Sequence, residues 1–206
     1  MKRFQLWCAT ALLPLFAACS FSVIPPAEYT ETRTFDLASP APAGDLPFVV
    51  DVETFSNECS GRYKMVVRED ANRIDVDDYN RWAMPPGAML TKYLAAKFAS
   101  EPDNRRGQTD KPAFILDGSV LNCEMDKTKK QVDLLVHFFI IQPGSNSSFR
   151  ITGTEDCVVS VKETSAEAFA DGLNKAAEKF ADRVVAVLKE ELRKRSGAAN
   201  PDQEKK

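Results

Sequence analysis

The segment VDLLVHFFII, residues 132–141, constrains the fold more than any other stretch of the chain. It is apolar at positions that would point to both faces of a strand. Such a pattern is typical of a central strand whose sheet is covered on both sides. The one histidine of the chain, His137, lies within this segment between Val136 and Phe138. We therefore expect His137 to be a hydrogen-bonded histidine of the core rather than a catalytic base.

Two further segments have the pattern of strands that flank this one. Residues 113–123 (AFILDGSVLNC) precede it, and residues 149–161 (FRITGTEDCVVSV) follow it with clean alternation of apolar and polar positions. Short polar connections join the three, which predicts an antiparallel meander. Residues 29–37, 48–55, 63–70 and 73–76 have the composition of additional, shorter strands.

Two amphipathic helices complete the predicted elements. The first begins at Pro85 and Pro86, where a missing N–H costs nothing, and continues to Phe98. The second is predicted to begin with a capping box of Thr164 and Glu167 and to end near Arg195. The sum is an α+β fold: a two-layer sandwich of a mostly antiparallel sheet with two long helices packed on it. We expect a single domain over residues 29–195 and a disordered tail over 196–206.

The N-terminus has the layout of a secretory signal. Two positive charges are followed by an apolar stretch that is too short to span a bilayer, and small residues precede Cys19. The arrangement is similar to a bacterial lipobox, although Phe16 replaces the usual leucine. We therefore predict a signal peptide over residues 1–18, acylation of Cys19 and a tether over 19–28. Ser20, which follows the cysteine, favours the outer membrane and a domain that faces the periplasm.

Composition excludes several classes of function. Without Lys2 and Arg3, the mature chain has 25 basic and 30 acidic residues, which argues against binding of nucleic acid. Scattered glycines form no phosphate loop, and nothing indicates a catalytic group, a metal or a cofactor, so we do not expect an enzyme. Three cysteines remain in the mature domain, and any two of them could form a disulfide: Cys59, Cys123 and Cys157.

The most distinctive segment is residues 61–98. It contains a strand with two arginines, a turn, a strand that ends in tyrosine, then tryptophan, prolines and a helix with spaced leucines. These positions are Arg62, Val67, Arg68, Tyr79, Trp82, Pro85, Pro86, Leu90 and Leu94. In this pattern the chain resembles the ABC-type transport auxiliary lipoproteins, and a looser resemblance extends over most of the mature chain.

The resemblance implies a partner rather than a reaction. Lipoproteins of this family accompany ABC transporters with mammalian-cell-entry (MCE) subunits, which move phospholipid across the envelope. The expected role is to dock such an MCE-domain subunit at the outer membrane. Candidate contact residues are Tyr79, Trp82, Pro85, Pro86 and Met89. For Trp82 and Tyr79, however, packing of the helix start onto the sheet is the favoured interpretation. Two alternatives stay open: a regulatory lipoprotein that activates a cell-wall synthase, and a periplasmic lipid-binding shuttle.

Overall fold

The structure is a computed structural model that describes residues 30–99, 111–144 and 149–198. The described residues from Thr32 onward belong to one compact unit. The predicted signal peptide, Cys19 and the tether lie outside the described residues, as does the predicted tail from residue 199 onward.

The predicted meander is present. Strands β6 (Ala113–Asp126), β7 (Gln131–Ile141) and β8 (Arg150–Ser160) pair antiparallel along nearly their whole length. β6 is three residues longer than expected, because a tight four-residue turn, rather than a longer loop, connects it to β7. The side chain of Asp126 accepts the N–H of Lys129 in this turn at 2.8 Å, and Lys130 takes a positive φ of 51°.

The rest of the sheet is mixed. Its other strands are β1 (Arg33–Phe35), β2 (Val49–Val52), β3 (Ser56–Asn57), β4 (Lys64–Arg68) and β5 (Ile74–Trp82). The main order is β1-β5-β4-β6-β7-β8, and β2 and β3 also pair with β6. β4 and β5 are antiparallel, whereas β1 runs parallel to β5, and β2, β3 and β4 run parallel to β6. The α+β class is thus confirmed, with parallel pairings in the N-terminal half of the sheet.

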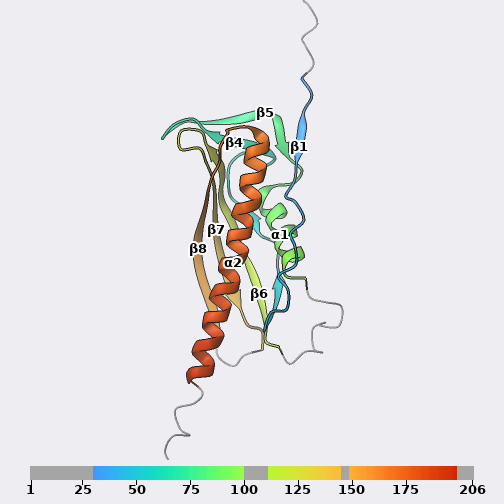
Figure 1. The fold of residues 1–206 in the computed structure, drawn as a ribbon, viewed down its shortest axis with the longest axis vertical. Coiled ribbons are helices and arrows are strands. Elements are labelled where there is room, and N and C mark those ends of the chain that lie inside the picture. The colour runs from blue at the N-terminus through green and yellow to red at the C-terminus, as the bar shows by residue number, and fades with distance from the viewer. Residues whose placement is uncertain (1–29, 100–110, 145–148, 199–206) are drawn as a thin grey trace, which may run out of the picture. The chain divides into compact units, whose positions relative to one another are not determined.

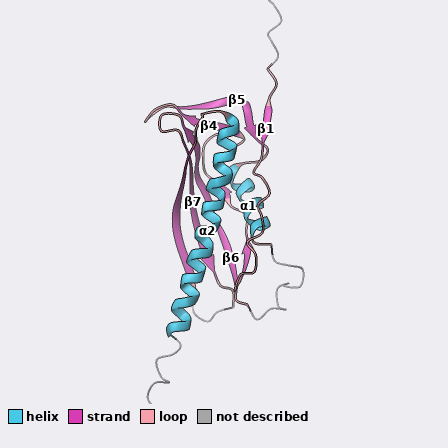
Figure 2. Cartoon of the chain, viewed as in Figure 1, coloured by secondary structure: helices cyan, strands magenta, loops and turns pink. Residues whose placement is uncertain are grey.

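Both helices of the described chain pack on the same face of the sheet (Figures 1 and 2). They are α1 (Pro86–Lys97) and α2 (Ala166–Ala198). β7 is accordingly buried at every second residue, Val132 to Ile140, and only half-buried or exposed at the positions between them. The expectation that this strand is covered on both faces is therefore wrong. Its outward apolar residues are partly shielded by neighbours instead, as where the guanidinium of Arg150 lies 5.2 Å from the ring of Phe139.

His137 points to this outer face and not into the core. Its Nδ1 lies 3.1 Å from the hydroxyl of Thr154 on β8. The predicted hydrogen bond is present, but the predicted location is wrong, because odd-numbered residues of β7 face away from the helices.

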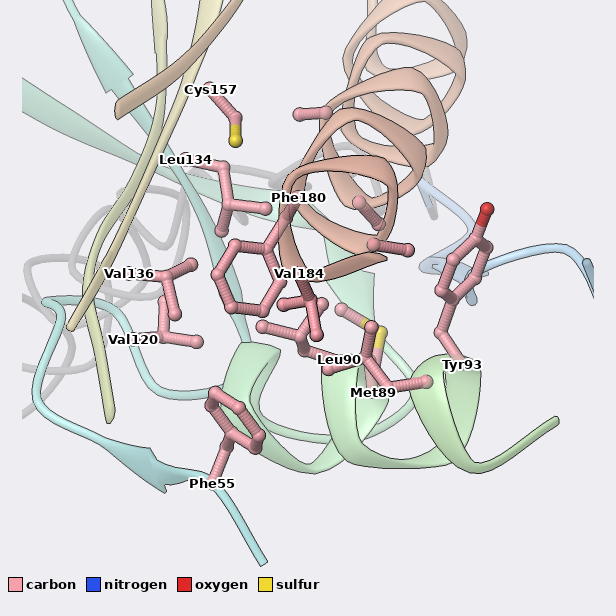
Figure 3. Packing of buried hydrophobic residues seen from close by; sticks show 14 of the residues in the cluster. Phe55, Met89, Leu90, Tyr93, Val120, Leu134, Val136, Cys157, Phe180 and Val184 are labelled. Atoms are coloured by element: carbon pink, nitrogen blue, oxygen red, sulfur yellow. The ribbon is translucent and has the colours of Figure 1, made fainter. Parts of the chain in front are cut away.

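The core lies between the sheet and the two helices (Figure 3). Phe180 of α2 is fully buried and contacts Phe138 of β7 and Phe55, with ring centroids 5.5 Å and 6.0 Å apart. Edge-on packing of this kind is favourable beyond the apolar area that it buries.

The long helix begins one residue later than its predicted capping box. Its first helical residue is Ala166, and the hydroxyl of Ser165 accepts the N–H of Ala168 at 3.2 Å. Ser165 thus occupies the N-cap position, whereas the predicted pair was Thr164 with Glu167. At its other end, the helix continues to Ala198, three residues beyond the expected end.

Candidate docking surface

Tyr79 is the exposed member of the predicted contact residues. Its side chain is 53% exposed on β5, far more than an aromatic residue of the core. The carboxylate of Asp77 accepts the backbone N–H of Tyr79 at 2.8 Å and that of Asn80 at 2.9 Å. Burial alone would raise the pKa of Asp77, but these bonds and the side chain of Asn80 hold it below its ordinary value. The ionised carboxylate therefore fixes the backbone that presents Tyr79.

Three of the other predicted contact residues are buried. Trp82, only 2% exposed, packs edge-on against Phe169 of α2 at 5.0 Å, and Pro86 and Met89 are buried in α1. They have no surface to offer a partner in this conformation and instead hold α1 and α2 against the sheet. Pro85 is half-buried just before α1, so Tyr79 and Pro85 remain the accessible part of the predicted set.

A cavity of about 320 Å³ opens next to Tyr79. It lies between β4, β5, the end of β6 and the start of α2. Apolar side chains form much of its lining: Met65, Val67, Val76, Met125 and Phe169. Its remaining lining is largely polar or charged: Asp75, Asp77, Asp78, Tyr79, Lys127, Thr164 and Ser165. Sequence reasoning missed this cavity because its walls come from segments that are as much as 104 residues apart, from Met65 to Phe169.

The strand that carries Tyr79 has one open edge. β1 pairs with β5 only at Asn80, Arg81 and Trp82. Among the described residues, no strand pairs with that side of β5 between Ile74 and Tyr79. An open strand edge is a template for association, and charged side chains normally protect it from non-specific pairing. The three aspartates of β5 (Asp75, Asp77 and Asp78) supply that protection here.

Buried charges lie close to the same end of the sheet. Glu124 of β6 is 5% exposed and accepts two hydrogen bonds from the guanidinium of Arg68 on β4, at 2.6 Å and 2.8 Å. This bidentate pair adds a side-chain link between β4 and β6, whose backbones adjoin at Val67–Met125 and Arg68–Asp126. β4 is in turn the antiparallel partner of β5. The strand that carries the exposed tyrosine is thereby connected to the central meander.

A further carboxylate at this end of the sheet, that of Asp133 on β7, lies in an environment that disfavours its charge. Burial raises the pKa of its carboxyl, an effect that the hydrogen bond from Gln131 opposes and that the nearby charges of Asp156 and Glu124 reinforce. One of its carboxylate oxygens is buried without a hydrogen-bond partner.

We expect Asp133→Asn to raise the free energy of unfolding at neutral pH. The pKa is higher in the folded chain than in the unfolded chain, so the ionised folded state carries the full penalty above the folded pKa. The penalty disappears as pH falls below the ordinary pKa of aspartate, about 3.9. Urea unfolding at pH 7 and near pH 4 should show that the advantage of the variant shrinks in acid. Asp171→Asn is the matched control, because Asp171 is exposed on α2 and is not among the groups that shift the pKa of Asp133. An equal advantage of Asp133→Asn at both pH values would contradict this assignment.

The three cysteines of the domain are free thiols in this structure. Cys59 is half-buried just after β3, while Cys123 of β6 and Cys157 of β8 are buried. Burial raises the pKa of Cys157 to about 12 and that of Cys123 well above its ordinary value. Neither buried thiol is therefore a nucleophile at neutral pH.

An open mixed sheet with helices on one face, and with one exposed tyrosine beside a small cavity, defines a domain of the α+β class. Residues 59–185 match the family described as the ABC-type transport auxiliary lipoprotein component. The match covers more than half of the chain, and the chain belongs to this family.

Solved structures with similar folds support the same architecture. One is an uncharacterized protein at 12% identity and a TM-score of 0.57, with 77% of this chain and 99% of that chain covered. Another is protein XCC0632 from Xanthomonas campestris at 15% identity and a TM-score of 0.54, with 74% and 92% covered. At these identities the likeness shows the fold alone. A comparison with curated proteins finds no match.

In the part of the chain that the structure describes, neither helix combines the length and the apolar character needed to cross a membrane.

Proposed function

We propose that this lipoprotein is held at the outer membrane by acylated Cys19 and docks the MCE-domain subunit of an ABC-type lipid transporter. The observation that carries the proposal is membership of the transport auxiliary family over residues 59–185. The chemistry of the N-terminus adds to it, because the small residues before Cys19 suit cleavage and acylation at that cysteine. Each buried methylene of an acyl chain contributes about 0.8 kcal/mol, so several chains hold a domain firmly on a membrane.

A tethered domain needs an exposed contact rather than a reaction centre. Tethering raises the effective concentration of the domain for any partner in the same compartment. Tyrosine is among the residues that dominate the energetics of interfaces, and Tyr79 presents a large ring on a backbone fixed by Asp77. We propose Tyr79, with Pro85 and the mouth of the adjacent cavity, as the surface that contacts the MCE-domain subunit.

Crosslinking in cells tests this surface. A photo-reactive phenylalanine analogue in place of Tyr79 should crosslink to the MCE-domain subunit after illumination. The same analogue in place of Tyr63 is the matched control, because Tyr63 is also exposed, at 42%, and does not line the cavity. Equal crosslinking from both positions, or none from position 79, would count against the surface.

The anchor is tested separately. Growth with a labelled palmitate precursor should label the wild-type chain and leave Cys19→Ser unlabelled, and the variant should leave the membrane fraction. If the Cys19→Ser chain stayed in the membrane fraction, the proposed acyl anchor would be wrong, but the proposed contact surface would be unaffected.

The cavity is also relevant to a second candidate function, that of a lipid-binding shuttle. Its apolar floor suits an alkyl group, but about 320 Å³ is at the small end of the range for ligand pockets, roughly 300–1,000 Å³. Mass spectrometry of lipid extracted from the purified soluble domain separates the two functions. Stoichiometric phospholipid would favour the shuttle, and its absence would favour the docking role.

A further inference from the structure

We propose that Cys59 and Cys123 form a disulfide when the chain folds in an oxidising compartment. The proposal rests on the proposed envelope location for the oxidising conditions and on the sheet register for the choice of partners. It selects one of the three pairings that the sequence left open.

The register places these two cysteines on neighbouring strands. β3 runs parallel to β6, with Ser56 opposite Ser119 and Asn57 opposite Val120. The N–H of Glu58 continues this ladder with a hydrogen bond of 2.9 Å to the carbonyl of Val120. Cys59 is the next residue along the chain, so it lies beside β6 just beyond Val120. Adjacent strands are about 4.8 Å apart, a spacing compatible with the Cα separation of a disulfide, roughly 4.4–6.8 Å.

Both side chains also lie on the same face of the sheet. β6 has a bulge between Val120 and Asn122, so Cys123 is the next residue after Val120 to point into the core. Cys59 is two residues after Asn57, which faces the helices and accepts the N–H of Gly87 of α1 at 3.1 Å. Cys59 accordingly packs against the hydrophobic core. The electrostatic influence of Cys59 on the pKa of Cys123 is a second sign that the thiols are close.

The other two pairings conflict with the spacing of the strands. Cys123 lies opposite Leu134 of β7, and Leu134 lies opposite Cys157 of β8. Cys123 and Cys157 are therefore two strand spacings apart, roughly 9.6 Å, which is beyond the reach of a disulfide. Cys59 is on the opposite side of β6 and is one spacing farther from Cys157.

The chemistry proceeds by thiol–disulfide exchange with a disulfide donor such as oxidised glutathione or an oxidised protein dithiol. The half-buried Cys59 reacts first: its thiolate attacks the donor, forms a mixed disulfide and releases one donor thiolate. The thiolate of Cys123 then attacks the sulfur of Cys59 and releases the second donor thiol. Two protein thiols are oxidised, one donor disulfide is reduced to two thiols, and the two thiol protons pass to the released donor thiolates. Burial of Cys123 holds its pKa high in the folded chain, so the second step belongs to folding, before that thiol is enclosed.

Peptide mapping tests the pairing without any variant. Trypsin places the three cysteines on separate peptides, residues 34–62, 107–127 and 151–162, because the Lys111–Pro112 bond resists cleavage. The soluble domain is unfolded and reduced, then refolded with oxidised and reduced glutathione, alkylated and digested. The expected result is a crosslink between peptides 34–62 and 107–127 that disappears on reduction, with peptide 151–162 alkylated. A crosslink that contains peptide 151–162, or complete alkylation of all three cysteines, would overturn the proposal.

Two variants test independently which cysteines form the disulfide. Cys157→Ser should keep the crosslink and the higher Tm of the oxidised protein, whereas Cys59→Ser should lose both. Closing a loop of this length stabilises the folded state by restricting the unfolded chain, so the oxidised wild type should melt at least about 5 °C above the reduced wild type. An equal Tm in the two redox states would contradict a native disulfide.

The same mapping on chain recovered from cells separates this proposal from the proposed location. A crosslink formed in the refolding experiment but absent from the cellular protein would uphold the pairing and overturn the oxidising envelope location. The wrong pairing in both experiments would overturn the disulfide and leave the location standing.

Discussion

Replacing Trp82 by Ala is expected to lower the free energy of unfolding by about 3–5 kcal/mol, the usual cost of removing a large aromatic side chain from a core. Trp82 is 2% exposed, ends β5 and packs edge-on against Phe169 at the start of α2. The substitution leaves a cavity at the point where the strand, the long helix and the chain leading into α1 meet. Urea unfolding monitored by far-UV circular dichroism measures the loss.

Tyr79→Ala is the matched control for this substitution. Tyr79 lies three residues earlier on the same strand and is 53% exposed, so its removal should change the free energy of unfolding by no more than about 0.5 kcal/mol. Co-purification of the proposed MCE-domain partner should respond in the opposite order: lost in Tyr79→Ala, and kept by Trp82→Ala under conditions in which that variant is folded. A small effect of Trp82→Ala on stability would contradict its assignment to the core.

Gly118→Ala is expected to cost about 3 kcal/mol, the upper part of the range for overpacked cores. A Cβ at this position of β6 would lie 2.2 Å from the carbonyl oxygen of His137 and 2.8 Å from the ring of Phe55. The carbonyl belongs to the backbone of β7, which is held on both sides by the meander and cannot move away cheaply. Thermal and urea unfolding of the variant should both show the loss, and insoluble expression would be its extreme form.

Gly153→Ala is the control, because it adds the same methyl group to β8, on the other side of β7 from β6. There the three atoms nearest to the new Cβ all belong to the ring of Phe138, the nearest at 2.9 Å, and a side-chain ring can shift more readily than backbone. We expect a cost of about 1 kcal/mol. If the two substitutions lowered the free energy of unfolding equally, the backbone of β7 would move aside as easily as the ring of Phe138, which would contradict this prediction.

The location of Tyr79 and Trp82 shows how far local pattern could identify the surface. Both are aromatic residues of one predicted segment, and composition gives no reason to separate them. On a strand, residues three apart point to opposite faces, but that rule needs the strand to reach Trp82. The residue pattern indicated a strand only over residues 73–76, and the family resemblance extended it no farther than Tyr79. The structure extends β5 to Trp82, so one ring faces solvent and the other faces α2.

The pairing of the cysteines illustrates the same limit. Sequence could count three thiols in the domain and enumerate their pairings. Only the register of β3, β6, β7 and β8 shows which two lie on adjacent strands. The cavity beside Tyr79 likewise depends on contacts between β4, β5, β6 and α2, which no local segment encodes.

Local patterns in the chain were enough to predict the three strands of the meander, the two amphipathic helices, the α+β class and the family to which the central segment belongs. Alternation and helical periodicity are properties of neighbouring residues, so they survive without tertiary context. Tertiary structure alone decided which strands run parallel, which face the helices cover and where His137, Trp82 and the three thiols lie. Those outcomes depend on the burial of apolar area between distant segments, and that free energy is set by the packing of the whole sheet against both helices.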